Sequence, residues 1–116
     1  MLAVVAPACL IDSGHGLLRS DECFGERAVF GERAKSIPIS SNESIIGHTL
    51  SAAGAVEAVF TLLTLQHQRI PPTINYAVPD PAIPLDVVPN VARDAKVSHA
   101  ISNSFGFGGQ NVSLVM

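Results

Sequence analysis

The longest apolar stretch of the chain runs from Leu50 to Leu65 and stands out from the mixed pattern around it. Few of its positions are polar, so a helix formed here would be apolar on almost every face and would have to be enclosed by other layers. The run is shorter than the ~20 residues of a membrane span and carries a carboxylate in its middle. It therefore predicts a buried helix of a soluble domain. Its polar positions are Ser51, Glu57, Thr61 and Thr64.

The first turns of this predicted helix are built from small residues, Ala52 to Ala55, with Gly54 among them. Glycine inside a helix costs about 1 kcal/mol relative to alanine. We expect a close approach of neighbouring backbone at Gly54 to compensate for that cost.

Short extended segments surround the helix. Met1–Ile11 is typical of a strand and turn, and Ser36–Ser40 alternates as a short strand, although Pro38 disfavours a central position in a sheet. Residues His67–Ile70 lead the chain out of the helix, and Pro71 and Pro72 stop any helical continuation. The proline-rich stretch to Ala92 predicts an ordered, mostly extended surface crossover.

The C-terminal part of the chain predicts a β-hairpin. Lys96–Phe105 and Asn111–Met116 have the pattern of two strands, and the glycine-rich residues 106–110 join them. The order is strand, buried helix, crossover and hairpin, which indicates an α/β fold.

Composition narrows the possible functions. The 116 residues make up one domain or part of one, and a net charge of −3 without any basic cluster argues against nucleic acid or an anionic membrane as a partner. Cys9 and Cys23 are too few for a disulfide framework, so we expect a reduced, cytoplasmic setting. The sequence FGERA occurs at residues 24–28 and again at 30–34, which is too short a repeat for a solenoid and indicates a local duplication or a damaged reading frame.

Candidate chemistry centres on His48, at the start of the predicted helix. The positive end of a helix dipole favours the neutral imidazole, which could donate a hydrogen bond to a developing oxyanion; the alternative is a histidine that bonds a nearby carbonyl. Glu57, if buried, needs a partner or a proton. His15 lies in a glycine-flanked loop, whereas His67 and His99 have the context of surface or strand residues.

Other sites have weaker support. Gly106, Gly108 and Gly109 could adopt positive φ and line an oxyanion hole with backbone N–H groups, or simply form a tight hairpin. Because a strand follows them, they do not fit a phosphate-binding loop. No metal-ligand spacing is present, and nothing near Cys9 would activate its thiol.

Taken together, three segments closely resemble the C-terminal end of β-ketoacyl-acyl-carrier-protein synthases, and of the elongating synthase II type above all. They are SIIGHTLSAAGAVEAVF, PPTINYAVPDPAIPLDVVPNVARDAK and SNSFGFGGQNVSLV, and the resemblance covers about residues 28–116. It implies part of a thiolase-like αβαβα fold, a homodimer or heterodimer of ketosynthase subunits, and acyl carrier protein as the partner that brings malonyl and acyl groups. No cofactor or metal is implied.

The resemblance also assigns roles to residues of this chain. His48 matches the histidine of the family's GH motif, which stabilises the enolate formed on decarboxylation. Phe107 matches the gating phenylalanine of the GFGG loop, whose backbone N–H serves the oxyanion hole. The supporting residues that match the same motifs are Phe105, Gly106, Gly108, Gly109 and Asn111.

The chain departs from the family in three ways. The nucleophilic cysteine belongs to a part of these enzymes that has no counterpart here, and Cys9 does not replace it. His15 matches the second catalytic histidine only in part, because Leu17 stands for the threonine of its HGT motif. Glu43 stands where the family has a lysine that pairs with the glutamate matched by Glu57, so two carboxylates face each other and the pKa of one should rise.

The sequence thus predicts a C-terminal ketosynthase fragment that is inactive alone, with residues 1–27 diverged or damaged. A non-catalytic partner similar to a chain-length factor is the alternative, favoured by Glu43 and the altered HGT region. A third hypothesis is the remnant of a broken gene, favoured by the FGERA duplication. A partial thiolase-type fold should leave strand edges unpaired and the central helix partly uncovered.

Overall fold

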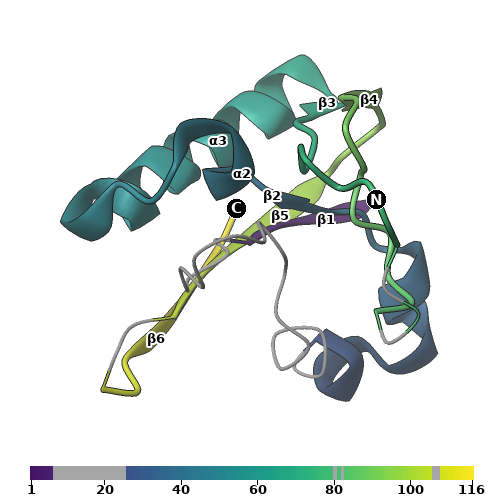
Figure 1. Ribbon diagram of the computed structural model, residues 1–116, viewed down its shortest axis with the longest axis horizontal. Helices are drawn as coiled ribbons and strands as arrows, with labels where there is room; N and C mark the ends of the chain where they lie inside the picture. The colour runs from purple at the N-terminus through teal and green to yellow at the C-terminus, as the bar shows by residue number, and fades with distance from the viewer. Residues whose placement is uncertain (7–25, 80, 82, 106–107) are drawn as a thin grey trace.

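The computed structural model describes residues 1–6, 26–79, 81, 83–105 and 108–116 (Figure 1). The fold combines helices with a mixed sheet, so the α/β expectation is confirmed. Residues 26–30 are helical. The remaining elements are β1 (Leu2–Ala6), η1 (Gly31–Ser36), β2 (Ile39–Ser41), α2 (Glu43–Ile46), η2 (Leu50–Ala52), α3 (Ala53–His67), β3 (Arg69–Ile70), β4 (Arg93–Asp94), β5 (His99–Phe105) and β6 (Asn111–Val115).

The main sheet has the strand order β2-β1-β5-β6. Strand β1 lies between two parallel partners, and its Val4 is opposite Ile39 of β2 and Ile101 of β5. Strands β5 and β6 form the predicted antiparallel hairpin, in which Phe105 is opposite Asn111. The N-terminal strand is therefore paired with a segment almost a hundred residues later in the chain, a non-local arrangement that the sequence pattern did not reveal.

Helix α3 packs along one face of this sheet and contacts β5 most extensively (Figure 1). The close approach expected at Gly54 is present, because a Cβ atom added there would lie 3.2 Å from the side-chain oxygen of Ser104 on β5. That distance is tighter than most real Cβ contacts. The glycine thus allows the first turn of α3 to lie directly on the sheet.

The predicted helix is present, but it buries polar side chains and leaves several apolar side chains exposed. Its buried residues are Glu57, Thr61 and Thr64, and the two threonine hydroxyls donate to the carbonyls of the residues four positions earlier, at 2.8 and 2.9 Å. The opposite face carries Val59, Leu62 and Leu63, with exposed fractions of 55%, 54% and 41%. Among the described residues, the sheet covers one face of the helix, and the expected enclosure on all faces is not found there. Among the described helices, none is both long and apolar enough to cross a membrane.

Helix α3 ends at His67, where the chain was expected to leave the helix. Gln68 adopts the left-handed conformation at φ 55° and turns the chain into β3. Strand β3 then pairs with β4 in a second, two-stranded sheet that the sequence did not predict. Proline therefore follows the helix end and does not cause it.

The segment from Pro71 to Ala92 was expected to cross the surface, and in this respect the prediction was wrong. Although irregular, it supplies much of the apolar core: Tyr76, Ile83 and Val87 pack with Ile37 and Ile39, whereas Val88 packs in a second cluster with Ile70, Val97 and Ala100. Isolated bridges pair Pro38 with Asp86 and Thr73 with Pro89. An irregular segment has no hydrophobic period, so its buried positions leave no signal in the pattern.

Candidate functional site

Some of the predicted site residues lie outside the described residues, namely His15, Gly106 and Phe107, together with Cys9 and Cys23. Their roles remain predictions. The structure places the others at two locations. Glu43, His48 and Glu57 belong to α2, the turn after it and α3, whereas Phe105, Gly108, Gly109 and Asn111 belong to the hairpin.

His48 is positioned by the turn that ends α2. Gly47 closes this short helix with its N–H donating to the Glu43 carbonyl at 2.8 Å, and its backbone angles are φ 73° and ψ 169°. Only glycine readily adopts this combination. The turn brings the chain back, so that the side chain of His48 reaches the first residue of the helix that it has just left.

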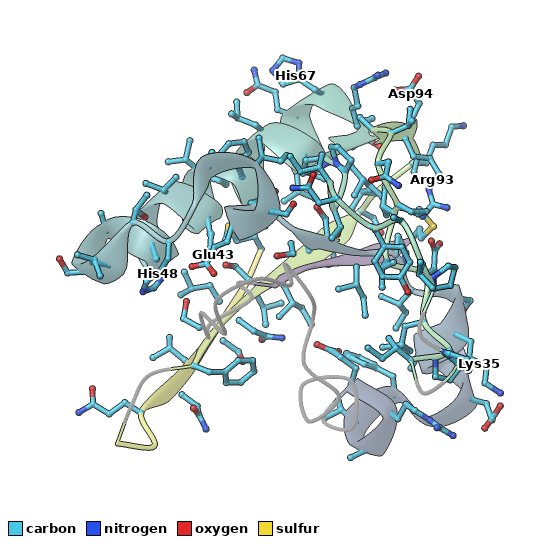
Figure 2. The ribbon with its side chains drawn as sticks, in the orientation of Figure 1. Lys35, Glu43, His48, His67, Arg93 and Asp94 are labelled. Atoms are coloured by element: carbon cyan, nitrogen blue, oxygen red, sulfur yellow. The ribbon has the colours of Figure 1, made fainter. Side chains whose placement is uncertain are left out.

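The imidazole of His48 contacts a carboxylate. Its Nδ1 lies 2.6 Å from Oε1 of Glu43, and the two side chains are 24% and 8% exposed, respectively. Figure 2 shows both side chains on the side of α2 and α3 that faces the sheet. His48 was expected at the mouth of the long helix, but η2 separates it from the first residue of α3. Because the influence of a helix dipole fades within one turn, Glu43 is the dominant charge beside this ring.

Glu57 lies on the buried face of α3, with none of its surface exposed. Neither carboxyl oxygen has a hydrogen-bond partner in the part of the chain that the structure describes. Burial raises the pKa of this carboxyl to about 8, and the nearby negative charge of Glu43 adds to the effect. The expected conflict between the two carboxylates is thus resolved by a proton on Glu57 at neutral pH, while Glu43 bonds His48.

The cluster brings together three groups that can each carry a proton. An imidazole, a carboxylate and a protonated carboxyl lie together, and the Nε2 atom of His48 has no hydrogen-bond partner among the described residues. Sequence reasoning singled out all three residues, but it did not pair His48 with Glu43. A spacing of five positions does not predict contact on a regular helix; the contact arises from the turn at Gly47.

The hairpin turn forms the second location. Gly108 and Gly109 have φ angles of 93° and 83°, as expected for a glycine-dependent turn, and a Cβ atom added at either would meet nothing within 4 Å. Asn111 is exposed at the start of β6. No hydrogen bond or ion pair among the described residues joins this turn to His48.

A pocket of about 260 Å³ lies away from His48, beside the helical residues 26–30 and strands β5 and β6. Its polar residues form a chain in which Asn103 donates to Glu26 at 3.1 Å and accepts from the Ser113 hydroxyl at 2.7 Å. Burial raises the pKa of Glu26, and the hydrogen bond from Asn103 opposes this rise. No pattern in the sequence predicted this pocket, since Glu26 belongs to the first FGERA copy and Asn103 to a distant strand. Among the described residues, no three histidine, cysteine or acidic side chains could hold a metal ion.

Comparison with known proteins identifies relatives for most of the chain. A model of the β-ketoacyl synthase C-terminal domain matches residues 18–77. The 3-oxoacyl-[acyl-carrier-protein] synthase 2 of Staphylococcus aureus is 49% identical over 86 residues, which are 74% of this chain and 21% of that protein. The protein of the same name from Vibrio harveyi is 49% identical over 90 residues, or 78% of this chain and 22% of that protein. The chain spans about a fifth of the length of these relatives.

Solved structures agree. The ishigamide ketosynthase/chain length factor matches this chain with a TM-score of 0.84 and 32% identity. The match covers 98% of this chain and 27% of that structure's chain. For a β-ketoacyl synthase from Burkholderia phymatum, the TM-score is 0.81 at 38% identity, with the same coverage of 98% and 27%. A type II polyketide ketosynthase in complex with its acyl-carrier protein has a TM-score of 0.80 at 41% identity and covers 83% and 24%. These matches confirm the expected fold, which is the C-terminal portion of a thiolase-like ketosynthase.

Proposed function

The chain belongs to the β-ketoacyl synthase family, whose C-terminal domain it carries, and from this premise we propose that it supplies the histidine side of a decarboxylative condensing site. In a complete enzyme, the imidazolium form of His48 donates a hydrogen bond from Nε2 to the thioester carbonyl of a malonyl group. The bond between the malonyl α-carbon and its carboxylate breaks, and carbon dioxide leaves. The electron pair of the broken bond forms the enolate. The enolate carbon then attacks an acyl thioester on a cysteine outside the matched segments, and the thiolate leaves.

The observation that carries this proposal is the placement of His48. Its ring is held through Nδ1 by Glu43, whereas Nε2 is the ring nitrogen left for a substrate and the side chain is partly exposed. An imidazole oriented from one side by a buried carboxylate is the arrangement expected of a catalytic histidine. Phe107 would gate entry of the acyl chain, and His15 would be the second catalytic histidine.

The 116 residues by themselves should not catalyse condensation, because Cys9 is not in the context of the family's nucleophile. We propose that condensation requires the segments of a ketosynthase that this chain does not match, in a homodimer or heterodimer, and that acyl carrier protein delivers the substrates. One structural relative is a ketosynthase in complex with its acyl-carrier protein, which supports the choice of partner.

A chimera tests the proposal. The segment of the Staphylococcus aureus synthase that aligns with this chain is replaced by the chain itself, and release of carbon dioxide from malonyl-carrier protein is measured. His48→Ala should abolish release, whereas His67→Ala, at an exposed position on the last turn of α3, should retain it. Decarboxylation that persists in the His48→Ala chimera refutes the assignment.

A non-catalytic partner subunit is the second candidate. It is favoured by Glu43, which replaces the lysine expected from the family, and by the similarity to a ketosynthase/chain length factor. In this case the chain should co-purify with a complete ketosynthase, and His48→Ala should leave condensation by that complex unchanged.

A further inference from the structure

The contact between Glu43 and His48 constrains which ring nitrogen carries a proton. Nδ1 of His48 and Oε1 of Glu43 are 2.6 Å apart, and at this distance one of the two atoms must donate a hydrogen bond. The side chain of Glu43 is 8% exposed, so solvent competes little for its carboxylate. The donor is therefore either the ring nitrogen or a protonated carboxyl.

The surroundings identify the donor as the ring. Glu57 lies near Glu43, is fully buried and has no hydrogen-bond partner among the described residues, so of the two carboxyls it is the one that is protonated at neutral pH. A carboxylate at Glu43, placed 2.6 Å from the ring nitrogen, can only accept. Nδ1 of His48 must donate.

We infer that Glu43 is a positioning residue that holds the proton of His48 on Nδ1 and leaves Nε2 of the neutral ring as a proton acceptor. This inference rests on the proposed function and changes how the ring takes part in it. A neutral ring in this tautomer cannot donate from Nε2 to a thioester carbonyl, and only the imidazolium can. As a neutral ring, His48 can instead accept a proton from a bound substrate. In the described structure the titratable group that contacts the ring is Glu43 on α2, and Glu57 on α3 lies near Glu43.

The test is a tautomer measurement on the complete 116-residue chain. Long-range proton–nitrogen NMR correlations of the four histidine rings, recorded above the pH at which they become neutral, show which nitrogen of each carries the proton. His48 is assigned by the signals that vanish in His48→Gln. We expect its proton on Nδ1, in contrast to the exposed His67. A proton on Nε2 of His48 overturns the inference. So do tautomer signals that are averaged and the same for all four histidine rings.

Two variants separate the role of Glu43 from general structural support. Glu43→Gln keeps an amide oxygen that can accept, so His48 should keep its tautomer. Glu43→Leu removes the acceptor, and the proton should move to Nε2. The control Glu32→Leu changes an exposed glutamate on η1 and should leave the His48 signals in place. An unchanged tautomer in Glu43→Leu overturns the inference.

The outcome does not depend on catalysis. If the chimera loses no activity in His48→Ala, the proposed function fails whatever the tautomer. If the tautomer is wrong, the role of Glu43 fails while the proposed function stands.

Discussion

The side-chain amide of Gln68 pairs with both backbone polar groups of Val97. Its Nε2 donates to the Val97 carbonyl and its Oε1 accepts from the Val97 N–H, each at 2.9 Å. The amide thus replaces a strand partner for Val97, which is buried at 4% exposure. Because Gln68 is also the left-handed residue that ends α3, one side chain ties the end of the helix to the segment that leads into β5.

Gln68→Asn should therefore destabilise the chain. Asparagine tolerates the φ of 55° but is one methylene shorter, so both bonds to Val97 are lost and a buried N–H and C=O remain unpaired. We expect a loss of about 1–3 kcal/mol in the free energy of unfolding, measured in urea. Gln66→Asn, at an exposed position of the same helix, is the control. It should lower the free energy of unfolding by only about 0.3 kcal/mol. Equal losses in the two variants would contradict the role of the Val97 bonds.

Much of the fold was predictable because its elements leave local signals. The apolar run from Leu50 predicted α3, and alternation flanking a glycine-rich turn predicted the β5–β6 hairpin. The need for close packing at Gly54 was also correct. The helix and the hairpin depend on residues close in the sequence, whereas the neighbour that Gly54 packs against, Ser104, lies on the distant strand β5.

The features that were missed depend on distant residues. The pairing of β1 with β5 joins opposite ends of the chain, and the core side chains of the segment from Pro71 to Ala92 follow no period. The burial of Glu57, Thr61 and Thr64 in place of the leucines of α3 is decided by which face meets the sheet, and hydrophobicity alone selects the wrong face.

The candidate site was predictable in its members but not in its geometry. Position in the predicted helix singled out His48 and Glu57, and the family resemblance added Glu43 together with the expectation that one of two facing carboxyls has a raised pKa. The hydrogen bond between Glu43 and His48 required the coordinates, because it depends on backbone angles that are accessible only to glycine at position 47.

Glu57→Gln should change how stability depends on pH. In the folded chain Glu57 keeps its proton up to about pH 8, whereas the unfolded chain loses it near the ordinary pKa of 4.5. Between these values the folded state binds more protons, so the free energy of unfolding falls as the pH rises. Each unit of pKa difference is worth about 1.4 kcal/mol. Because glutamine does not titrate, the variant should lose this fall and gain stability relative to the wild type from pH 5 to pH 8.

Urea unfolding at several pH values measures this effect. Glu32→Gln is the matched control, since it removes an exposed carboxylate that pairs with Lys35, and it should leave the slope between pH 5 and pH 8 as it is in the wild type. If Glu57→Gln and the wild type show the same slope, Glu57 is ionised in the folded chain at neutral pH.

Gly47→Ala should be destabilising through the backbone alone. A Cβ atom at this position would meet nothing within 4 Å, but φ 73° with ψ 169° is a conformation that residues with a side chain avoid. The expected loss is about 1–3 kcal/mol in the free energy of unfolding. Gly31→Asn is the control, because its site is equally open and asparagine accepts a φ of 57°. A Gly47→Ala chain as stable as Gly31→Asn would show that the turn before His48 can relax.

Leu62→Lys should reduce self-association of the isolated chain. Val59, Leu62 and Leu63 form a stripe along the outer face of α3, and β6 adds exposed apolar side chains at the edge of the sheet. Exposed apolar surface of this kind promotes association. Because Leu62 is 54% exposed, its replacement should change the free energy of unfolding by no more than about 0.5 kcal/mol.

Sedimentation velocity should show a larger monomer fraction for Leu62→Lys than for the wild type. Gln66→Lys adds the same charge at an exposed polar position of α3 and should have little effect. Equal monomer fractions in the two variants would mean that added charge, and not loss of the apolar stripe, controls association.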